Sequence, residues 1–267
     1  MKMRTTVYTH EELAELFDAK TIAIRCIGTF TTSAAGTVPA DDKALADFCR
    51  HHLGLTDDQI PAAVARIKRE ELGEKDTTPE TGELAEKESY GLVSWRKDEE
   101  GRPWLGHWMI KACAKHAWQR LGFSVARKYT KGDLAECTTV APMGHSAMST
   151  SPERVYLYTI GDEGKATAAT TEYARFTGSV GHPTGKVSIC NDVEIVAPGS
   201  HFGFEMRVPS RVIKEPDLRL MLALMPRIGL GGARSFERGN YRWEYVEITA
   251  PVVPKQETKK KKKHKAS

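Results

Sequence analysis

Residues 229–243, GLGGARSFERGNYRW, decide how the end of the chain folds. Four glycines stand there among arginines and aromatic residues, after an apolar helix-like run at 218–226 and before a strand-like stretch at 241–250. Walker and dinucleotide-binding loops place their glycines after a strand and before a helix. Here the order is helix, glycines, strand, the Walker pattern is absent, and Arg234 stands where the dinucleotide pattern requires glycine. The stretch therefore fits neither kind of mononucleotide site.

The composition of this stretch supports two interpretations. Amides freed by the glycines, together with Arg234, Arg238 and Arg242, would suit the successive phosphates of a long anion, and Phe236 and Tyr241 would stack on bases. Alternatively, the glycines form a tight turn that lets the last strand enter a sheet, and the arginines are merely solvated. The residue pattern leaves both interpretations open.

The hydrophobic pattern predicts an α+β protein built around an antiparallel sheet, because strands and helices are interspersed and short turns join several of the strands. The residues 105–121 give the strongest helix, with Trp108, Ala112, Cys113 and Ala117 on its apolar stripe. The other predicted elements are strands at 21–30, 91–96, 154–160, 167–176, 192–198, 201–208 and 241–250, and helices at 44–54, 56–72 and 218–226.

The domain organisation follows from composition. The capping box THEE at 9–12 predicts a helix within residues 1–20, and residues 21–250 form one domain. Charged residues and glycines predict a flexible loop at 73–89, and glycines with a proline predict an exposed hairpin at 177–191. Residues 251–267 read as a disordered, lysine-rich tail.

The positive charge of the chain is concentrated at its end. The formal net charge is +4, but residues 255–267 carry +6, which leaves −2 for the rest. An anionic partner of the body must therefore meet a local patch. A second basic cluster lies on and after the helix at 105–121, and its alternative interpretation is a solvated helix face; it comprises Lys111, Lys115, Arg127, Lys128 and Lys131.

Cysteine usage and hydropathy indicate an intracellular setting. The five cysteines are odd in number and form no CxxC pair, which favours reduced thiols. Cysteine and histidine show no metal-ligand spacing, and no segment resembles a signal peptide or a membrane span. We therefore expect a soluble cytoplasmic protein that needs no metal, cofactor or membrane.

The segment RIGLGGARSFERGNYRWEYVEI at 227–248 resembles the glycine-rich C-terminal signature of the RAMP superfamily, the RNA-binding proteins of CRISPR effector complexes. Two further segments agree with the resemblance. DVEIVAPGSHFGFEMRVP at 192–209 resembles the acidic strand, Pro-Gly turn and long strand of that family, and WLGHWMIKACAKHAWQRLG at 104–122 resembles its helix with a basic residue, here Lys111.

The resemblance implies an RRM-like, ferredoxin-type sheet with insertions that binds single-stranded RNA or DNA. It also implies a homo-oligomer along the strand, as in the effector backbone subunits, possible contacts with other effector subunits, and a thumb-like hairpin, for which 177–191 is the candidate. Three alternatives stay open: a stand-alone single-strand binder of phage type, a structural assembly protein, and an endoribonuclease.

Three residues are candidates for a catalytic role. Asp41 and Asp42 follow the first strand, where some members of the superfamily carry a metal-binding acid, but an aspartate before LADFC also suits a helix N-cap. His145 lies in a Gly/Ser-rich segment and would titrate near neutral pH, although a single loop histidine is usually a surface residue. We expect a binding protein rather than an enzyme.

Overall fold

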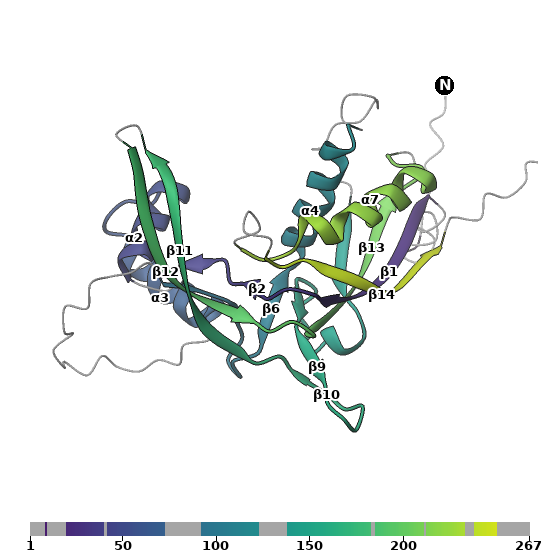
Figure 1. Cartoon of the computed structure of the whole chain (residues 1–267), viewed down its shortest axis with the longest axis horizontal. Helices are drawn as coiled ribbons and strands as arrows, with labels where there is room; N and C mark the ends of the chain where they lie inside the picture. The colour runs from purple at the N-terminus through teal and green to yellow at the C-terminus, as the bar shows by residue number, and fades with distance from the viewer. Residues whose placement is uncertain are drawn as a thin grey trace, which may run out of the picture.

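The computed structural model describes residues 9, 20–39, 42–72, 92–122, 138–182, 185–210, 212–232 and 238–249, with the backbone alone at 176–182 and 185–191. The predicted α+β class is confirmed (Figure 1). The strands are β1 (Thr21–Phe30), β2 (Ala34–Ala35), β3 (Val38–Pro39), β4 (Leu92–Ser94), β5 (Arg96–Lys97), β6 (Pro103–Gly106), β7 (Thr139–Pro142), β8 (Arg154–Tyr156), β9 (Tyr158–Ile160), β10 (Ala166–Ala168), β11 (Thr171–His182), β12 (Gly185–Val196), β13 (His201–Pro209) and β14 (Tyr241–Thr249). The helices are α2 (Asp42–His52), α3 (Ile60–Glu71), α4 (His107–Arg120), α7 (Glu215–Ile228) and the 3-10 turn η1 (Gly144–Ser146).

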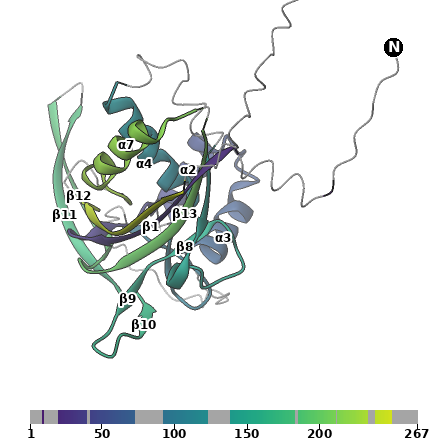
Figure 2. The same ribbon diagram turned by 90° about the vertical axis from the view of Figure 1, so that its right-hand side faces the viewer.

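The strand order of the central sheet is consistent with a ferredoxin-type βαββαβ unit. Within this six-stranded sheet, β14, β1, β13 and β7 lie in that order, and each neighbouring pair is antiparallel. The other two strands are β9, which also pairs with β13, and β10, which pairs with β9. The helix α4 precedes β7 in the chain, and α7 connects β13 to β14. Both helices cover the same face of the sheet (Figure 2). Long insertions separate β1 from α4 and β7 from β13.

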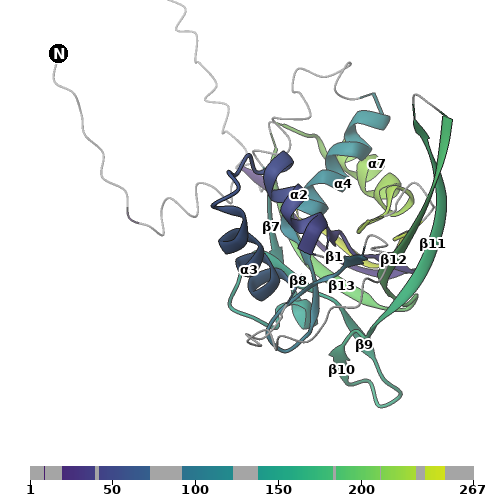
Figure 3. The same cartoon turned by 90° about the vertical axis from the view of Figure 1, so that its left-hand side faces the viewer.

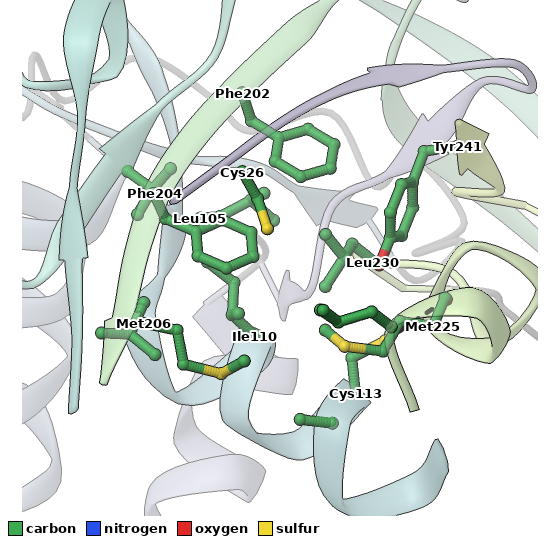
Figure 4. Close-up of a cluster of buried hydrophobic side chains, with 14 of the residues drawn as sticks. Cys26, Leu105, Ile110, Cys113, Phe202, Phe204, Met206, Met225, Leu230 and Tyr241 are labelled. Atoms are coloured by element: carbon green, nitrogen blue, oxygen red, sulfur yellow. Dashed lines mark hydrogen bonds between the residues drawn. The ribbon is translucent and has the colours of Figure 1, made fainter. Parts of the chain in front are cut away.

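The main core lies between this sheet and its two helices. Alternate residues of β1 and β13, among them Cys26 and Phe204, point toward Ile110 of α4 and Met225 of α7, and all four are fully buried (Figure 4). Burial raises the pKa of the Cys26 thiol to about 12, so this cysteine is a core residue rather than a nucleophile.

The insertion after β1 contains the helices α2 and α3, which pack on each other around Leu45 and Ile60 as a separate small core (Figure 3). The predicted helix at 56–72 begins only at Ile60, because residues 57–59 form a turn before Pro61. The first residue of α2 is Asp42, whose carboxylate is 2.5 Å from the Lys68 ammonium of α3.

The strands β11 and β12 form a long two-stranded ribbon that projects from the body (Figure 1). Pairing runs from Thr171 and Val196 at its root to His182 and Gly185 near its tip. At the root, β12 also pairs in parallel with β4 and in antiparallel with β2. The hairpin predicted at 177–191 is the outer part of this ribbon.

Several further sequence predictions were wrong in detail. The strand predicted at 91–96 is divided into β4 and β5, and the strand predicted at 167–176 is divided into β10 and β11. The helix predicted at 105–121 begins at His107, because residues 103–106 form β6 between β5 and β8. The strand predicted at 154–160 is divided at Leu157, whose amide donates to the Pro103 carbonyl (2.9 Å) while its own carbonyl accepts from Ala169 (3.0 Å). This residue thus passes the chain from one sheet to the next.

The predicted N-terminal helix, the loop at 73–89 and the tail at 251–267 lie outside the described residues, apart from Thr9 and Lys20 in the first of these segments. No helix in the described ranges is both long and apolar enough to cross a membrane.

Candidate nucleic-acid interface

The glycine-rich turn after α7 packs its backbone directly on the segment at 33–36. The Gly232 amide donates to the Ala35 carbonyl (2.8 Å), and the Gly239 amide donates to the Ser33 carbonyl (2.9 Å). An added Cβ on Gly231 (φ +89°) would lie 2.6 Å from the Ala35 oxygen. Glycine is required because two backbones approach without room for a side chain.

This packing corrects one expectation from the sequence. The amides of Gly229, Leu230, Gly232 and Gly239 donate to carbonyls of the protein itself, so they are not free to meet phosphates. The tight-turn interpretation therefore describes the glycines better than the anion-cradle interpretation. Arg234 and Phe236 lie in 233–237, outside the described residues.

The other residues predicted in this stretch do not converge on one surface. Arg238 is half-buried and donates to the Ser33 hydroxyl. Arg242 is exposed and lies beside Thr29 on the sheet face that faces away from the helices, where it pairs with Glu244 (2.8 Å). Tyr241 is 4% exposed, and its ring packs edge-on against Phe202 with the centroids 5.1 Å apart. A ring so deeply buried cannot stack on a base, so Tyr241 is removed from the binding residues.

The basic residues of α4 are where the sequence places them. Lys111 and Lys115 are half-exposed and lie off the stripe that packs in the core. Burial, with a smaller contribution from the Lys111 charge, lowers the pKa of nearby His107. Arg127, Lys128 and Lys131 of the same predicted cluster lie outside the described residues.

A pocket of about 310 Å³ lies where the glycine turn meets α4 and β5. The turn contributes Leu230 and Gly231 to its lining, β5 contributes Arg96, and α4 contributes Trp108. Among the described residues, its lining is Thr37, Arg96, Trp108, Met109, Ala112, Leu230 and Gly231. The pocket combines an aromatic ring, a cation and a hydroxyl with apolar walls, as small-ligand sites commonly do.

Trp108 presents an aromatic surface to solvent at this pocket. It is 39% exposed, and its ring stands edge-on to Trp104 with the centroids 6.0 Å apart. An added Cβ on Gly106 would lie 2.5 Å from the Trp108 Cε2 atom, so the glycine leaves space for the ring. The indole is thus held by packing while part of it stays accessible.

Arg96 supplies the positive charge of the pocket. Its guanidinium carbon lies 4.9 Å from the Trp108 ring centroid and 5.6 Å from that of Trp104. Burial lowers the pKa of Arg96 to about 10, which leaves the side chain protonated at neutral pH. A cation stacked on indoles beside an accessible ring is an arrangement that can hold a base and its phosphate together.

The sequence pattern indicates neither Trp108 nor Arg96 as a binding residue. Apolar spacing places Trp108 on the packed stripe of the helix, but Trp108 and Ala112 share one side of α4, whereas Cys113 and Ala117 share the buried side. Dividing the apolar residues of the helix into two rows with a spacing of four residues would have separated Trp108 from the buried side. Arg96 carried no signal in the sequence, because tertiary packing brings β5 to the pocket.

The sheet face that faces away from the helices is charge-balanced. Arg25 pairs with Glu205 (3.0 Å) and Glu247 (3.6 Å), and Arg207 also pairs with Glu205 (2.7 Å). Burial would raise the pKa of Glu205, but hydrogen bonds from Arg207 and Arg25 outweigh it and lower that pKa. Tyr245 donates to Glu247 there (2.9 Å). Paired carboxylates make this face a poor surface for a polyanion.

The two catalytic candidates that the structure describes, Asp42 and His145, contact different partners. Asp42 forms the ion pair with Lys68 described above, and Asp41 lies outside the described residues. His145 is exposed on η1 and touches the Tyr158 ring at a centroid distance of 5.3 Å. In the described ranges, no three His, Cys, Asp or Glu side chains are grouped as a metal ion would require.

Comparisons with known proteins gave distant structural similarities. No protein-family model and no curated protein matches the chain. A chain in the cryo-EM structure of the type III-B Cmr-beta complex bound to cognate target RNA is similar at a TM-score of 0.39 and 12% identity, over 91% of this chain and 66% of that chain. A chain of a type IV-B CRISPR complex is similar at a TM-score of 0.35 and 10% identity, over 88% of this chain and 92% of that one. At these scores and identities, neither structure assigns a function to this chain.

Proposed function

We propose that this protein binds single-stranded RNA on the side of its helices, along a path from the basic side of α4 to the Arg96–Trp108 pocket. The single observation that carries the proposal is this pocket, in which an accessible indole lies beside a stacked guanidinium. One unstacked base would lie against Trp108, and the adjacent phosphate would meet Arg96. The half-exposed Lys111 and Lys115 would meet further phosphates.

The opposite sheet face supports the choice of surface. Its arginines are already paired with Glu205 and Glu247, so a strand bound there would have to displace carboxylates. Among the described residues that line the pocket, Arg96 is the charged one, and none is a carboxylate. The helix side therefore offers the more favourable electrostatics to a polyanion.

The sequence resemblance to the RAMP superfamily and the ferredoxin-type topology support a more specific form of the proposal. In that form, copies of the chain line up along one RNA strand as subunits of an RNA-guided effector assembly, and the β11–β12 ribbon reaches from one copy to the next. Single-stranded DNA as the ligand and a structural assembly protein are the alternatives that the experiment below separates. A stand-alone single-strand binder is a third alternative, which shares the proposed binding surface.

The test is a titration of fluorescently labelled single-stranded RNA and DNA with the chain ending at Pro254, across a range of salt concentrations. We expect RNA binding that weakens steeply with salt. Trp108→Ala is expected to lower affinity about 5- to 150-fold, because stacking on an aromatic ring contributes about 1–3 kcal/mol per base. Arg96→Ala is expected to reduce the salt slope by about 0.7, the value for one phosphate contact on a single strand.

Two exposed residues outside the pocket provide matched controls. Arg219 on α7 is 67% exposed in its side chain and Tyr245 on β14 is 45% exposed, so each offers the same chemistry elsewhere. Arg219→Ala and Tyr245→Ala should bind as the unmodified protein does. Equal losses in the control and pocket variants would contradict the proposed surface, and assembly of the protein without nucleic acid would favour the structural alternative.

A further inference from the structure

Glu194 of β12 is a carboxylate buried at the root of the ribbon. Its side chain is 2% exposed, and it accepts the Trp95 amide (2.9 Å). The carboxylate also accepts hydrogen bonds from the Lys97 ammonium and from the hydroxyl of Thr171 on β11. A buried charge is stable only with its partners in place, so these four residues hold one another in a single arrangement.

The same carboxylate controls the path of the strand that carries Arg96. Trp95 and Lys97, the two neighbours of Arg96 in the chain, are both bonded to Glu194. Side chains alternate along an extended segment, so Arg96 points away from Lys97 and toward the pocket. A shift of the segment at Glu194 would therefore move the guanidinium relative to Trp108.

A second connection runs through the backbone of Glu194. Its carbonyl accepts the Gly36 amide (2.8 Å), and the next residue, Thr37, lines the pocket. The neighbouring Ala35 carbonyl accepts the Gly232 amide (2.8 Å) of the glycine turn. Ribbon, glycine turn and pocket wall are thus joined by hydrogen bonds through residues 35–37 and Glu194.

We propose that Glu194 is a positioning residue for the pocket and that it couples the β11–β12 ribbon to RNA binding there. This inference rests on the proposed function. Glu194 is not among the described lining residues of the pocket, and it acts by fixing Arg96 relative to Trp108. Whatever holds the ribbon root in this arrangement, such as a neighbouring copy of the chain, then raises the affinity of the pocket for RNA, and bound RNA in turn stabilises the ribbon root.

The test measures single-stranded RNA affinity in the full chain for two variants with matched controls. Glu194→Gln removes the buried charge, and Asp192→Asn removes a carboxylate of the same strand that pairs instead with Arg175 (3.0 Å). Thr171→Val removes only the ribbon's hydroxyl, and Thr159→Val removes a comparable strand hydroxyl that bonds to Thr167 (3.2 Å). We expect about tenfold weaker binding for Glu194→Gln, about threefold for Thr171→Val, and no change for either control.

A double-mutant cycle with Arg96→Ala separates positioning from general destabilisation. If Glu194 acts through Arg96, then Glu194→Gln costs less than twofold in the Arg96→Ala protein, because the group it positions is already absent. A role in overall stability alone would give the same loss in both backgrounds, and that result would overturn the inference. Thermal melting of each variant shows whether it is folded. If Glu194→Gln is unfolded, the RNA affinity of Thr171→Val, which leaves the Glu194–Lys97 pair intact, tests the role of Glu194 instead.

The two proposals fail in distinguishable ways. Absence of RNA binding by the unmodified chain contradicts the proposed function itself. Binding that Arg96→Ala weakens but that Glu194→Gln and Thr171→Val leave unchanged overturns only the role of Glu194.

Discussion

Gly106→Ala tests whether the position of the Trp108 ring, and not only its presence, determines RNA binding. Gly106 precedes α4 with φ −69° and ψ 140°, a conformation that alanine adopts without strain. An added Cβ would, however, lie 2.5 Å from the Trp108 Cε2 atom, whereas ordinary contacts begin at 3.4 Å. The substitution therefore acts on the indole and not on the backbone.

The size of the effect follows from this geometry. The ring must move by about 1 Å or rotate away from its preferred side-chain conformation, which costs about 0.5–1.5 kcal/mol and changes the stability of the fold little. RNA affinity should fall more, because a displaced ring loses the base stack of about 1–3 kcal/mol and its contact with Arg96. We expect about 5- to 150-fold weaker binding, close to that of Trp108→Ala.

The assay is fluorescence anisotropy with labelled single-stranded RNA, together with thermal melting. Gly161→Ala is the matched control, because the nearest atom to an added Cβ there is 3.8 Å away and the glycine has no positive φ. The control should bind RNA normally. Unchanged affinity of Gly106→Ala, alongside weakened binding by Trp108→Ala, would refute the argument that the ring must hold this position.

Three further predictions concern stability and the choice of surface. Gly239→Ala should lower the melting temperature, because Gly239 has φ +71° and an added Cβ would lie 2.9 Å from the Leu230 carbonyl carbon. The left-handed conformation alone costs a non-glycine residue about 1–2 kcal/mol. An unchanged melting temperature would contradict the packing described. Burial lowers the pKa of His201 below 6.5, so its neutral form contributes stability that is present above pH 6.5 and is lost as the pH falls through the folded-state pKa. His201→Asn should therefore flatten the fall in melting temperature between pH 7 and 5. An unaltered pH profile of the melting temperature would contradict this role. Arg25→Ala should leave RNA affinity unchanged, since its guanidinium is occupied by Glu205, and a loss comparable to that of Arg96→Ala would move the binding surface to the other face of the sheet.

The sequence predicts the secondary structure well where local pattern and tertiary packing agree. The alternation of apolar residues at 21–30 predicts β1, and the spacing of apolar residues after Pro216 predicts α7, because both elements bury one continuous side. Resemblance of the glycine-rich segment to a known signature predicts the order of the elements that surround it. The class of fold follows from these elements.

The candidate site could be predicted only in part, because distant segments build it. Arg96 and Thr37 belong to the insertion after β1, and tertiary contacts, among them the hydrogen bonds through Gly36 and Glu194, bring them to α4 and the glycine turn. Tyr241 illustrates the opposite error: an aromatic residue beside arginines suggests stacking, but the strand alternation turns it into the core. Composition near a motif does not reveal which side of a strand faces solvent.

The central claim is that the pocket beside the glycine turn binds single-stranded RNA. The most direct measurement is the affinity of the chain ending at Pro254 for a labelled single-stranded RNA, compared with that of the same chain carrying both Arg96→Ala and Trp108→Ala. We predict salt-sensitive binding by the first protein and a loss of at least about tenfold in the second, which should remain folded. Equal affinity of the two folded proteins, or no binding by the first, would contradict the account.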